Sequence, residues 1–336
     1  MNPDPIRPVI FLVAIIAALA MAPVAPEAGN ILYLVAAGLA LLFLRSSDIR
    51  SFRRPIVWMP LAGLGILAVT YALAAGSLQG AVGIFFFAPF LAIWPLLALA
   101  KAKGQLDATT IVVLSLCGVA GAAAAAMAEV LTTGTVRAGS WVANPIHFAD
   151  VALAGGFLAT LGAVYGRGNW RYLYFSGPIF AGIAVLLSGT RGAVVSLALM
   201  AGTAFVVAII LRMITRRMLA IGGLAAIVVV IAAMAAGAGQ TSGMQRVMAD
   251  VVETLQTGLP TDESTALRLQ MYEGGFKAFL ASPLIGHGPF AYVEAAASRV
   301  TPPFVGAPHL HNDIADFAAS GGIFGLIAYF LLLLAP

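Results

Sequence analysis

The sequence predicts an all-α integral membrane protein with about ten transmembrane helices and one long polar loop outside the membrane. Of its 336 residues, 61% are hydrophobic and 10% are charged, whereas soluble proteins carry about 25% charged residues. The apolar residues also form long runs rather than scattered positions. Such runs form helices in a bilayer, because a helix bonds each backbone N–H and C=O group inside its own segment.

Ten apolar runs have about the 17–25 residues that cross a hydrocarbon core. The first is not a signal peptide, because it lacks a clean cleavage site and another span follows at once. Internal prolines such as Pro89 and Pro95 are expected to kink some helices. The predicted spans are residues 8–24, 30–44, 55–77, 80–100, 109–131, 146–165, 172–189, 193–211, 218–238 and 312–334.

Lysine and arginine residues predict the orientation of these spans. Twelve of the 18 lie in alternating loops on one side, which the positive-inside rule assigns to the cytoplasm. We therefore expect a cytoplasmic N-terminus and an outer loop at 239–311. The twelve are Arg7, Arg45, Arg50, Arg53, Arg54, Lys101, Lys103, Arg167, Arg171, Arg212, Arg216 and Arg217; on the other side are Arg137, Arg191, Arg246, Arg268, Lys277 and Arg299.

The outer loop 239–311 is far more polar than the spans. Apolar residues at helical spacing predict an amphipathic helix at 242–259. A second helix is expected at 264–280, begun by a Ser or Thr cap and ended by the Pro and Gly residues of 283–288. Prolines between 302 and 308 predict an irregular approach to the last span.

Arg191 lies in Ser188-Gly-Thr-Arg-Gly192, where the seventh span ends and the eighth begins. One interpretation is an interfacial anchor whose stem reaches the headgroups. The other is a phosphate site, because the flanking glycines allow close approach and guanidinium presents a planar fork of donors. Arg268, in the second loop helix, also has a structural and a binding interpretation. It could pair with Ser264, Thr265 or Tyr272, or form a salt bridge to Glu263 or Glu273; otherwise it is a binding cation.

The segment from Pro308 to Asp316 contains His309, His311, Asp313 and Asp316. A metal site is one interpretation, although no further histidine stands at a usual ligand spacing. The others are a hydrogen-bonded structural histidine and a general base, since imidazole exchanges protons near neutral pH. The two aspartates are expected to cap the last helix, to complement its dipole or to orient a histidine. Gly321, Gly322 and Gly325 are expected to be close-packing positions between helices.

Three motifs in order resemble those of bacterial O-antigen ligases. His311-Asn312, nine residues and then Gly322-Ile-Phe-Gly325 resemble the His-Asn…Gly-x-x-Gly motif of that family. The Ser-Gly-Thr-Arg-Gly segment at Arg191 resembles a second motif. Arg268 followed by Ser282-Pro-Leu-Ile-Gly-His-Gly288 resembles a third. The resemblance covers residues 185–334.

This resemblance implies a division into N-terminal transmembrane helices at 1–184 and a ligase-type domain at 185–336. It implies His311 as the catalytic base, and Arg191 and Arg268 as residues that bind a diphosphate. Asn312, His309 and Asp313 are expected to support them. Since the family has about twelve spans and this sequence gives ten, we also expect the parent protein to continue past Pro336.

The resemblance also implies the reaction. A glycan on undecaprenyl diphosphate would pass to a lipid A–core sugar hydroxyl at the periplasmic face of the bacterial inner membrane. The expected partners are these two substrates and membrane lipids. No cofactor, no metal and no nucleic acid are expected.

Two other kinds of function stay open on the sequence. An O-antigen polymerase or a protein O-oligosaccharyltransferase of the same superfamily would use the same donor with another acceptor. The short outer loop at 132–145 favours the ligase, because the polymerases tend to have two substantial outer loops. A transporter or flippase is less favoured, because the spans are nearly free of ionisable residues and no inverted repeat is visible.

Overall fold

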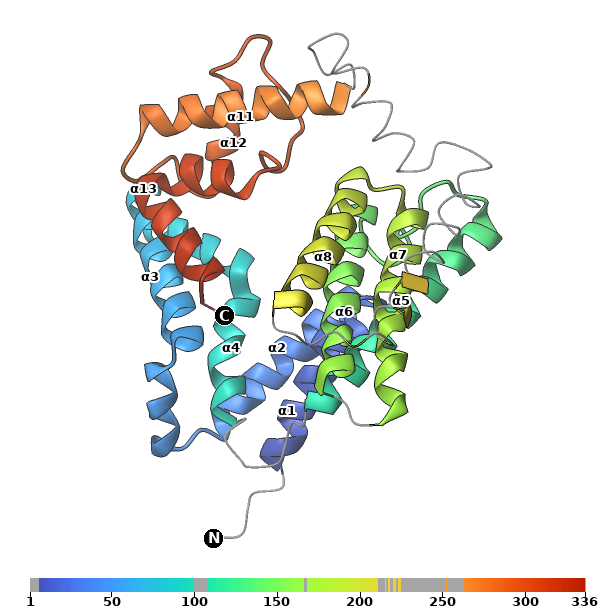
Figure 1. Cartoon of the computed structure of the whole chain (residues 1–336). Coiled ribbons are helices and arrows are strands. Elements are labelled where there is room, and N and C mark those ends of the chain that lie inside the picture. The colour runs from blue at the N-terminus through green and yellow to red at the C-terminus, as the bar shows by residue number, and fades with distance from the viewer. Residues whose placement is uncertain are drawn as a thin grey trace. The chain divides into compact units, whose positions relative to one another are not determined.

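The computed structural model describes residues 6–99, 108–165, 168–210 and 263–335, together with a few single positions between 215 and 252. All regular structure within these ranges is helical (Figure 1). The chain forms two compact units, each built from two separate stretches of sequence. The predicted ninth span at 218–238 and the predicted helix at 242–259 lie outside the described residues, apart from isolated positions.

The first unit contains the helices near the N-terminus and the middle of the chain. Within it, α5, α6 and α7 pack around small side chains: Gly156 on α6 faces Gly177 and Ala181 on α7, where a Cβ atom at Gly156 would lie 2.6 Å from that of Ala181. Such contacts between small residues let membrane helices approach closely. Its elements are α1 (Ile6–Ile16), the π-helical turn η1 (Ala17–Met21), most of α2 (Pro26–Leu42), α5 (Ala108–Thr133), α6 (Pro145–Tyr165), the 3₁₀ helix η4 (Asn169–Phe175), α7 (Ser176–Ser188) and α8 (Arg191–Ile210).

The second unit joins an early stretch of the chain to the C-terminal one. Leu64 and Leu67 of α3 are buried against Ala328 and Leu332 of α13, so two helices far apart in sequence share one core. The elements of this unit are the 3₁₀ helix η2 (Ser46–Arg53), α3 (Pro55–Ala75), the 3₁₀ helix η3 (Leu78–Phe87), α4 (Ala88–Leu99), α11 (Glu263–Ala281), α12 (Tyr292–Ala297) and α13 (Asp313–Leu333).

Nine of the ten predicted spans fall on helices of the described residues. Within these residues, six helical segments are long and apolar enough to cross a membrane, or seven if the bent pair α2 and η2 forms one span. The segments Ile6–Met21 and Arg191–Val207 are apolar but shorter. The number of ten spans therefore stays a prediction. The 3₁₀ helix η3 gives way to α4 next to Pro89, and the kinks expected at Pro89 and Pro95 stay predictions.

The C-terminal loop largely follows its prediction. The helix expected at 264–280 is α11, which ends at Ala281 before the predicted Pro and Gly residues. The side chains of Glu263 and Ser264 lie outside the described residues, so the predicted cap stays a prediction. The approach at 301–312 is irregular, as expected. The short helix α12 has no counterpart in the sequence prediction.

The last predicted span, 312–334, falls on α13, and this helix breaks at Gly322. This residue has φ 61° and ψ −148°, a region essentially reserved for glycine. In an unbroken helix, the N–H groups of Ile323 and Phe324 would donate to the carbonyl groups of Ala319 and Ser320. Here all four groups bond elsewhere.

Residues 283–288 fill the break in α13. The N–H groups of His287 and Gly288 donate to the carbonyl oxygens of Ala319 and Ser320 at 2.9 and 2.8 Å. The N–H groups of Ile323 and Phe324 donate in turn to Pro283 and Leu284, at 2.8 and 3.5 Å. Backbone irregularity at membrane depth is tolerated where such groups are satisfied inside the protein. The Pro-Leu-x-Gly-x-Gly and Gly-x-x-Gly motifs are therefore two halves of one structural element.

Replacement of Gly322 by Ala is expected to lower the free energy of unfolding by roughly 2–4 kcal/mol, because backbone strain and overpacking each cost about 1–3 kcal/mol. The added Cβ would lie 2.5 Å from the carbonyl oxygen of Leu284. Thermal unfolding in detergent micelles measures the change. Gly65→Ala is the matched control, because a Cβ on this exposed α3 glycine meets nothing within 4 Å. Equal unfolding temperatures for the two variants would contradict the assigned role of Gly322.

Candidate active site around His311

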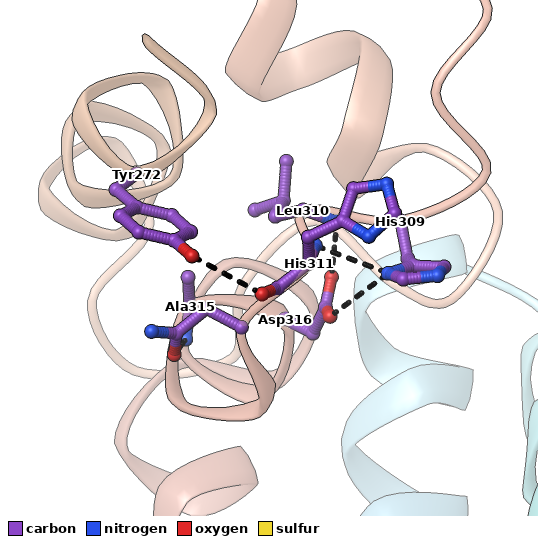
Figure 2. A network of polar contacts seen from close by, with 7 residues as sticks. Tyr272, His309, Leu310, His311, Ala315 and Asp316 are labelled. Atoms are coloured by element: carbon purple, nitrogen blue, oxygen red, sulfur yellow. Dashed lines mark hydrogen bonds and ion pairs between the residues drawn. The ribbon is translucent and has the colours of Figure 1, made fainter. Parts of the chain in front are cut away.

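His311 occupies a tight turn directly before α13. Its φ of 56° makes it the one non-glycine residue with positive φ among the described residues. This left-handed conformation is uncommon for a residue with a Cβ, and it persists where surrounding contacts enforce it. Its carbonyl oxygen accepts a hydrogen bond from the hydroxyl of Tyr272 at 3.2 Å, and its N–H donates to Nδ1 of His309 at 3.0 Å (Figure 2).

His309 contacts His311 through both its ring nitrogen and its ring face. The two ring centroids lie 4.2 Å apart. Because Nδ1 of His309 accepts the N–H of His311, that nitrogen carries no proton, and neutral His309 has its proton on Nε2. A carboxylate oxygen of Asp316 lies 3.9 Å from the same nitrogen. A proton on Nδ1 of His309 would strengthen its attraction to Asp316 and would remove the hydrogen bond from the N–H of His311.

Asp316 holds the preceding residue of the turn. Its Oδ1 accepts the N–H of Leu310 at 2.8 Å, and the hydroxyl of Tyr292 on α12 donates to the same carboxylate. Burial, and next the negative charge of Asp316, raise the pKa of Tyr292, so its phenol stays protonated as a donor. Leu310 itself is fully buried beside Gly275 of α11. This arrangement fixes the backbone that presents His311.

The helix α11 carries Arg268, the cation that the sequence predicts for the site. Arg268 is exposed and stands one turn before Tyr272, on neighbouring positions of the helix surface. Glu273 pairs with Lys277 at 2.6 Å, and no ion pair joins Glu273 to Arg268 within the described residues. The predicted salt bridge from Arg268 to Glu273 is therefore wrong, and its alternative to Glu263 lies outside the described side chains.

The environment of His311 favours its neutral form. Partial burial is the largest cause that lowers its pKa, followed by the neighbouring His309 and the positive charge of Arg268. A neutral imidazole has a lone pair that accepts a proton, which a general base requires. The side chain is exposed, so a substrate hydroxyl can reach it.

Replacement of Arg268 by Gln is expected to raise the pKa of His311. The positive charge of Arg268 disfavours the imidazolium, so its removal stabilises the protonated form, and the neutral base then needs a higher pH. Histidine-labelled ¹⁵N NMR in micelles measures the titration, with the signal assigned by its loss in His311→Asn. Lys277→Gln removes the same charge elsewhere on α11. A His311 midpoint that is equal in the two variants would contradict the electrostatic role of Arg268.

The other predicted supporting residues have different roles. Asn312 is the cap of α13, because its side-chain oxygen accepts the N–H of Ala315 at 3.1 Å. Of the roles left open for the two aspartates, the capping role is wrong: Asp313 is exposed, and Asp316 bonds to the turn before the helix. Both lie in the first turn of α13, where a negative charge complements the helix dipole. Within the described residues, no three His, Cys, Asp or Glu side chains come together as metal ligands would.

Arg191 lies in the first unit, as the first residue of α8. The turn before it is tightly bonded: Thr190 is buried, its hydroxyl donates to the carbonyl oxygen of Pro145 at 3.3 Å, and Gly189 has φ 61°. Arg191 itself is half-buried. The structure therefore groups His311, His309 and Arg268 in one unit, whereas the joint action of Arg191 with them stays a prediction.

Several residues that build the site were absent from the candidate site predicted from sequence. Tyr272 was named only as a partner for Arg268, whereas it bonds the backbone of His311. Tyr292 carried no pattern that marked it. His287 stood in the Ser282–Gly288 motif but had no predicted role; it bonds the carbonyl oxygen of Ala278 at 2.9 Å and holds the inserted loop. Asp316 was considered only as a cap, as a complement to the helix dipole or as an orienting residue. A useful signal for Asp316 is its place five residues after His311, inside the first turns of α13.

Residues 177–330 match the model of a protein family described as O-Antigen ligase. The match begins in α7, ends in α13 and includes the segments that carry Arg191, Arg268 and His311. No curated protein matches the chain. The matched range agrees with the resemblance derived from the three motifs, while the predicted boundary at 184 and 185 stays a prediction.

Proposed function

We propose that this chain, whose residues 177–330 match the model of the O-antigen ligase family, moves an O-antigen glycan from undecaprenyl diphosphate to lipid A–core. As a multi-pass membrane protein with several membrane-length helices, it has the setting that such lipid-linked substrates need. The proposed site faces the periplasm, in the orientation predicted from the basic residues. No metal and no cofactor take part in the proposed reaction.

The observation that carries this proposal is the environment of His311. The side chain is exposed, and its surroundings, which include the charge of Arg268, favour the neutral imidazole. A sugar hydroxyl of lipid A–core attacks the anomeric carbon of the donor glycan, and the hydroxyl proton passes to the imidazole. The bond between the anomeric carbon and the diphosphate oxygen breaks, and its electron pair leaves with undecaprenyl diphosphate. The lowered pKa of His311 keeps the base unprotonated before the reaction.

The leaving diphosphate gains negative charge as the bond breaks, and this charge needs a partner. Arg268 and Arg191 are the proposed partners, because guanidinium groups bind phosphate oxygens through two parallel N–H donors. Preorganised donors at developing charge usually supply a large share of the rate. Asp316, His309 and Tyr272 act indirectly: their contacts hold the turn that presents His311.

Complementation tests the proposal directly. The chain is produced in bacteria that lack their own ligase, and the lipopolysaccharide is analysed by gel and mass spectrometry. Long glycan on lipid A–core supports the proposed function. Glycan that stays on undecaprenyl diphosphate but grows longer would identify a polymerase, and glycan on protein would identify an oligosaccharyltransferase. Glycan that stays unchanged on undecaprenyl diphosphate, with the chain present in the membrane, would overturn the proposal.

A further inference from the structure

We propose that Arg137 is a further binding residue for the donor diphosphate, in the first unit beside the turn that carries Arg191. This inference rests on the proposed function, because it assigns a residue to the same donor. Arg137 lies in the connection between α5 and α6, far in sequence from every motif of the family match. Its side chain is exposed.

The side chain of Arg137 lies against the turn between α7 and α8. Its Nε donates to the carbonyl oxygen of Ser188 at 3.4 Å, and a Cβ atom at Gly189 would meet its Cγ at 3.3 Å. The neighbouring backbone N–H of Ala138 donates to Leu187 at 2.8 Å. Glycine at position 189 therefore admits the stem of Arg137, and the Ser-Gly-Thr-Arg segment is a docking place for a second arginine.

A buried carboxylate fixes the connection that carries Arg137. Glu129 of α5 is 2% exposed and accepts the N–H of Gly139 at 2.8 Å and the hydroxyl of Ser140. The backbone bend at Gly139 packs onto Phe148, where a Cβ would lie 2.9 Å from the ring. A buried carboxylate is costly unless its oxygens are bonded, and here the loop supplies those bonds. The loop is consequently held rigid two residues after Arg137.

The guanidinium of Arg137 retains donors for a ligand. Only Nε is bonded to the turn, and within the described residues its two terminal nitrogen atoms have no hydrogen-bond or ion-pair partner. Those nitrogens carry four of the five N–H donors of the group. Arg191 follows Ser188 by three residues, so the turn between α7 and α8 is bonded to Arg137 at Ser188 and followed directly by Arg191. Their combined charge suits a diphosphate, whose two phosphoryl groups each attract a cation.

Binding of undecaprenyl diphosphate to the full chain in nanodiscs tests this role. Arg137→Gln is expected to weaken binding about tenfold, which is the lower end of the effect of losing one charged hydrogen-bonding partner. The unfolding temperature before the lipid is added is expected to stay unchanged. Arg171→Gln is the matched control, because it removes the same charge from η4. This residue lies near the start of the membrane-length segment Asn169–Ser188, whereas Arg137 bonds to the end of that segment. Undecaprenyl monophosphate is the second probe, and its affinity is expected to fall less.

The outcomes separate this inference from the proposed function. Equal affinity of wild type and Arg137→Gln for the diphosphate would overturn the role of Arg137 and leave the proposed function intact. Absence of diphosphate binding by the wild-type chain would overturn both. If Arg137→Gln does not fold, Arg137→Lys keeps the charge but loses the planar fork. A weakening of about threefold or more in Arg137→Lys would support the role, and wild-type affinity would overturn it.

Discussion

Replacement of His311 by Asn is expected to lower the rate of glycan transfer by about 10²–10⁴-fold, the usual contribution of a positioned general base. Asparagine tolerates positive φ better than most residues, so the turn at φ 56° is retained while the base is lost. The hydrogen bonds of the turn through the backbone of residue 311 stay available to Tyr272 and His309. The loss would therefore report chemistry rather than folding.

The measurement is the rate of glycan transfer from undecaprenyl diphosphate to lipid A–core with purified chain in nanodiscs. His147→Ala is the control, because His147 is an exposed histidine on the first turn of α6 in the other unit. His309→Ala is expected to have a smaller effect, since it removes a contact to the turn and leaves the base. A transfer rate for His311→Asn within threefold of the His147→Ala rate would exclude His311 as the base.

Replacement of Arg268 by Gln is expected to lower kcat by about 10²–10³-fold, the effect of removing one preorganised partner of transition-state charge. Arg268 lies on α11 in the same unit as His311, and its positive charge contributes to the lowered pKa of His311. Loss of the cation leaves the departing diphosphate less stabilised. Lys277→Gln is the control on the same helix, where only an exposed pair with Glu273 is lost, worth about 0.3–0.5 kcal/mol.

The same assay tests whether Arg191 acts on the same diphosphate. Arg191→Gln is compared with Arg268→Gln and with the double variant. Residues that stabilise one transition state together give a combined loss different from the sum, whereas independent sites add within about 0.3–0.5 kcal/mol. Activity of Arg268→Gln equal to that of Lys277→Gln would exclude Arg268 from the site. Additive losses would argue against a shared diphosphate.

Arg268→Gln has two effects on the rate, one on the leaving diphosphate and one on the pKa of His311, and the assay must separate them. Since the charge of Arg268 lowers the pKa of His311, Arg268→Gln also raises the pH at which the base becomes neutral. The kcat comparison is therefore made on the high-pH plateau, where His311 is neutral in every variant. A loss of kcat that persists on this plateau measures the missing stabilisation of the leaving diphosphate. A loss that disappears there measures the shifted protonation of His311.

The sequence by itself determined the class of protein, and it supplied the residues proposed for the site. Apolar runs of membrane length predict helices wherever they occur, because the bilayer leaves backbone groups no other partner. The motifs around His311, Arg268 and Arg191 likewise indicated a resemblance to O-antigen ligases, and the model of that family matches residues 177–330. Local patterns also predicted α11, because a Ser or Thr cap before it and the Pro and Gly residues after it are features of the sequence alone.

Only the tertiary structure decided how those residues are held. The break of α13 at Gly322 depends on the segment 283–288, which satisfies the freed backbone groups from about 35 residues earlier in the chain. The positive φ of His311 likewise depends on Tyr272 and on the bond from Leu310 to Asp316. Arg137 meets the turn before Arg191 across 51 residues. These contacts join distant segments, and hydrophobic periodicity describes only neighbours along a helix, so no local pattern contains them.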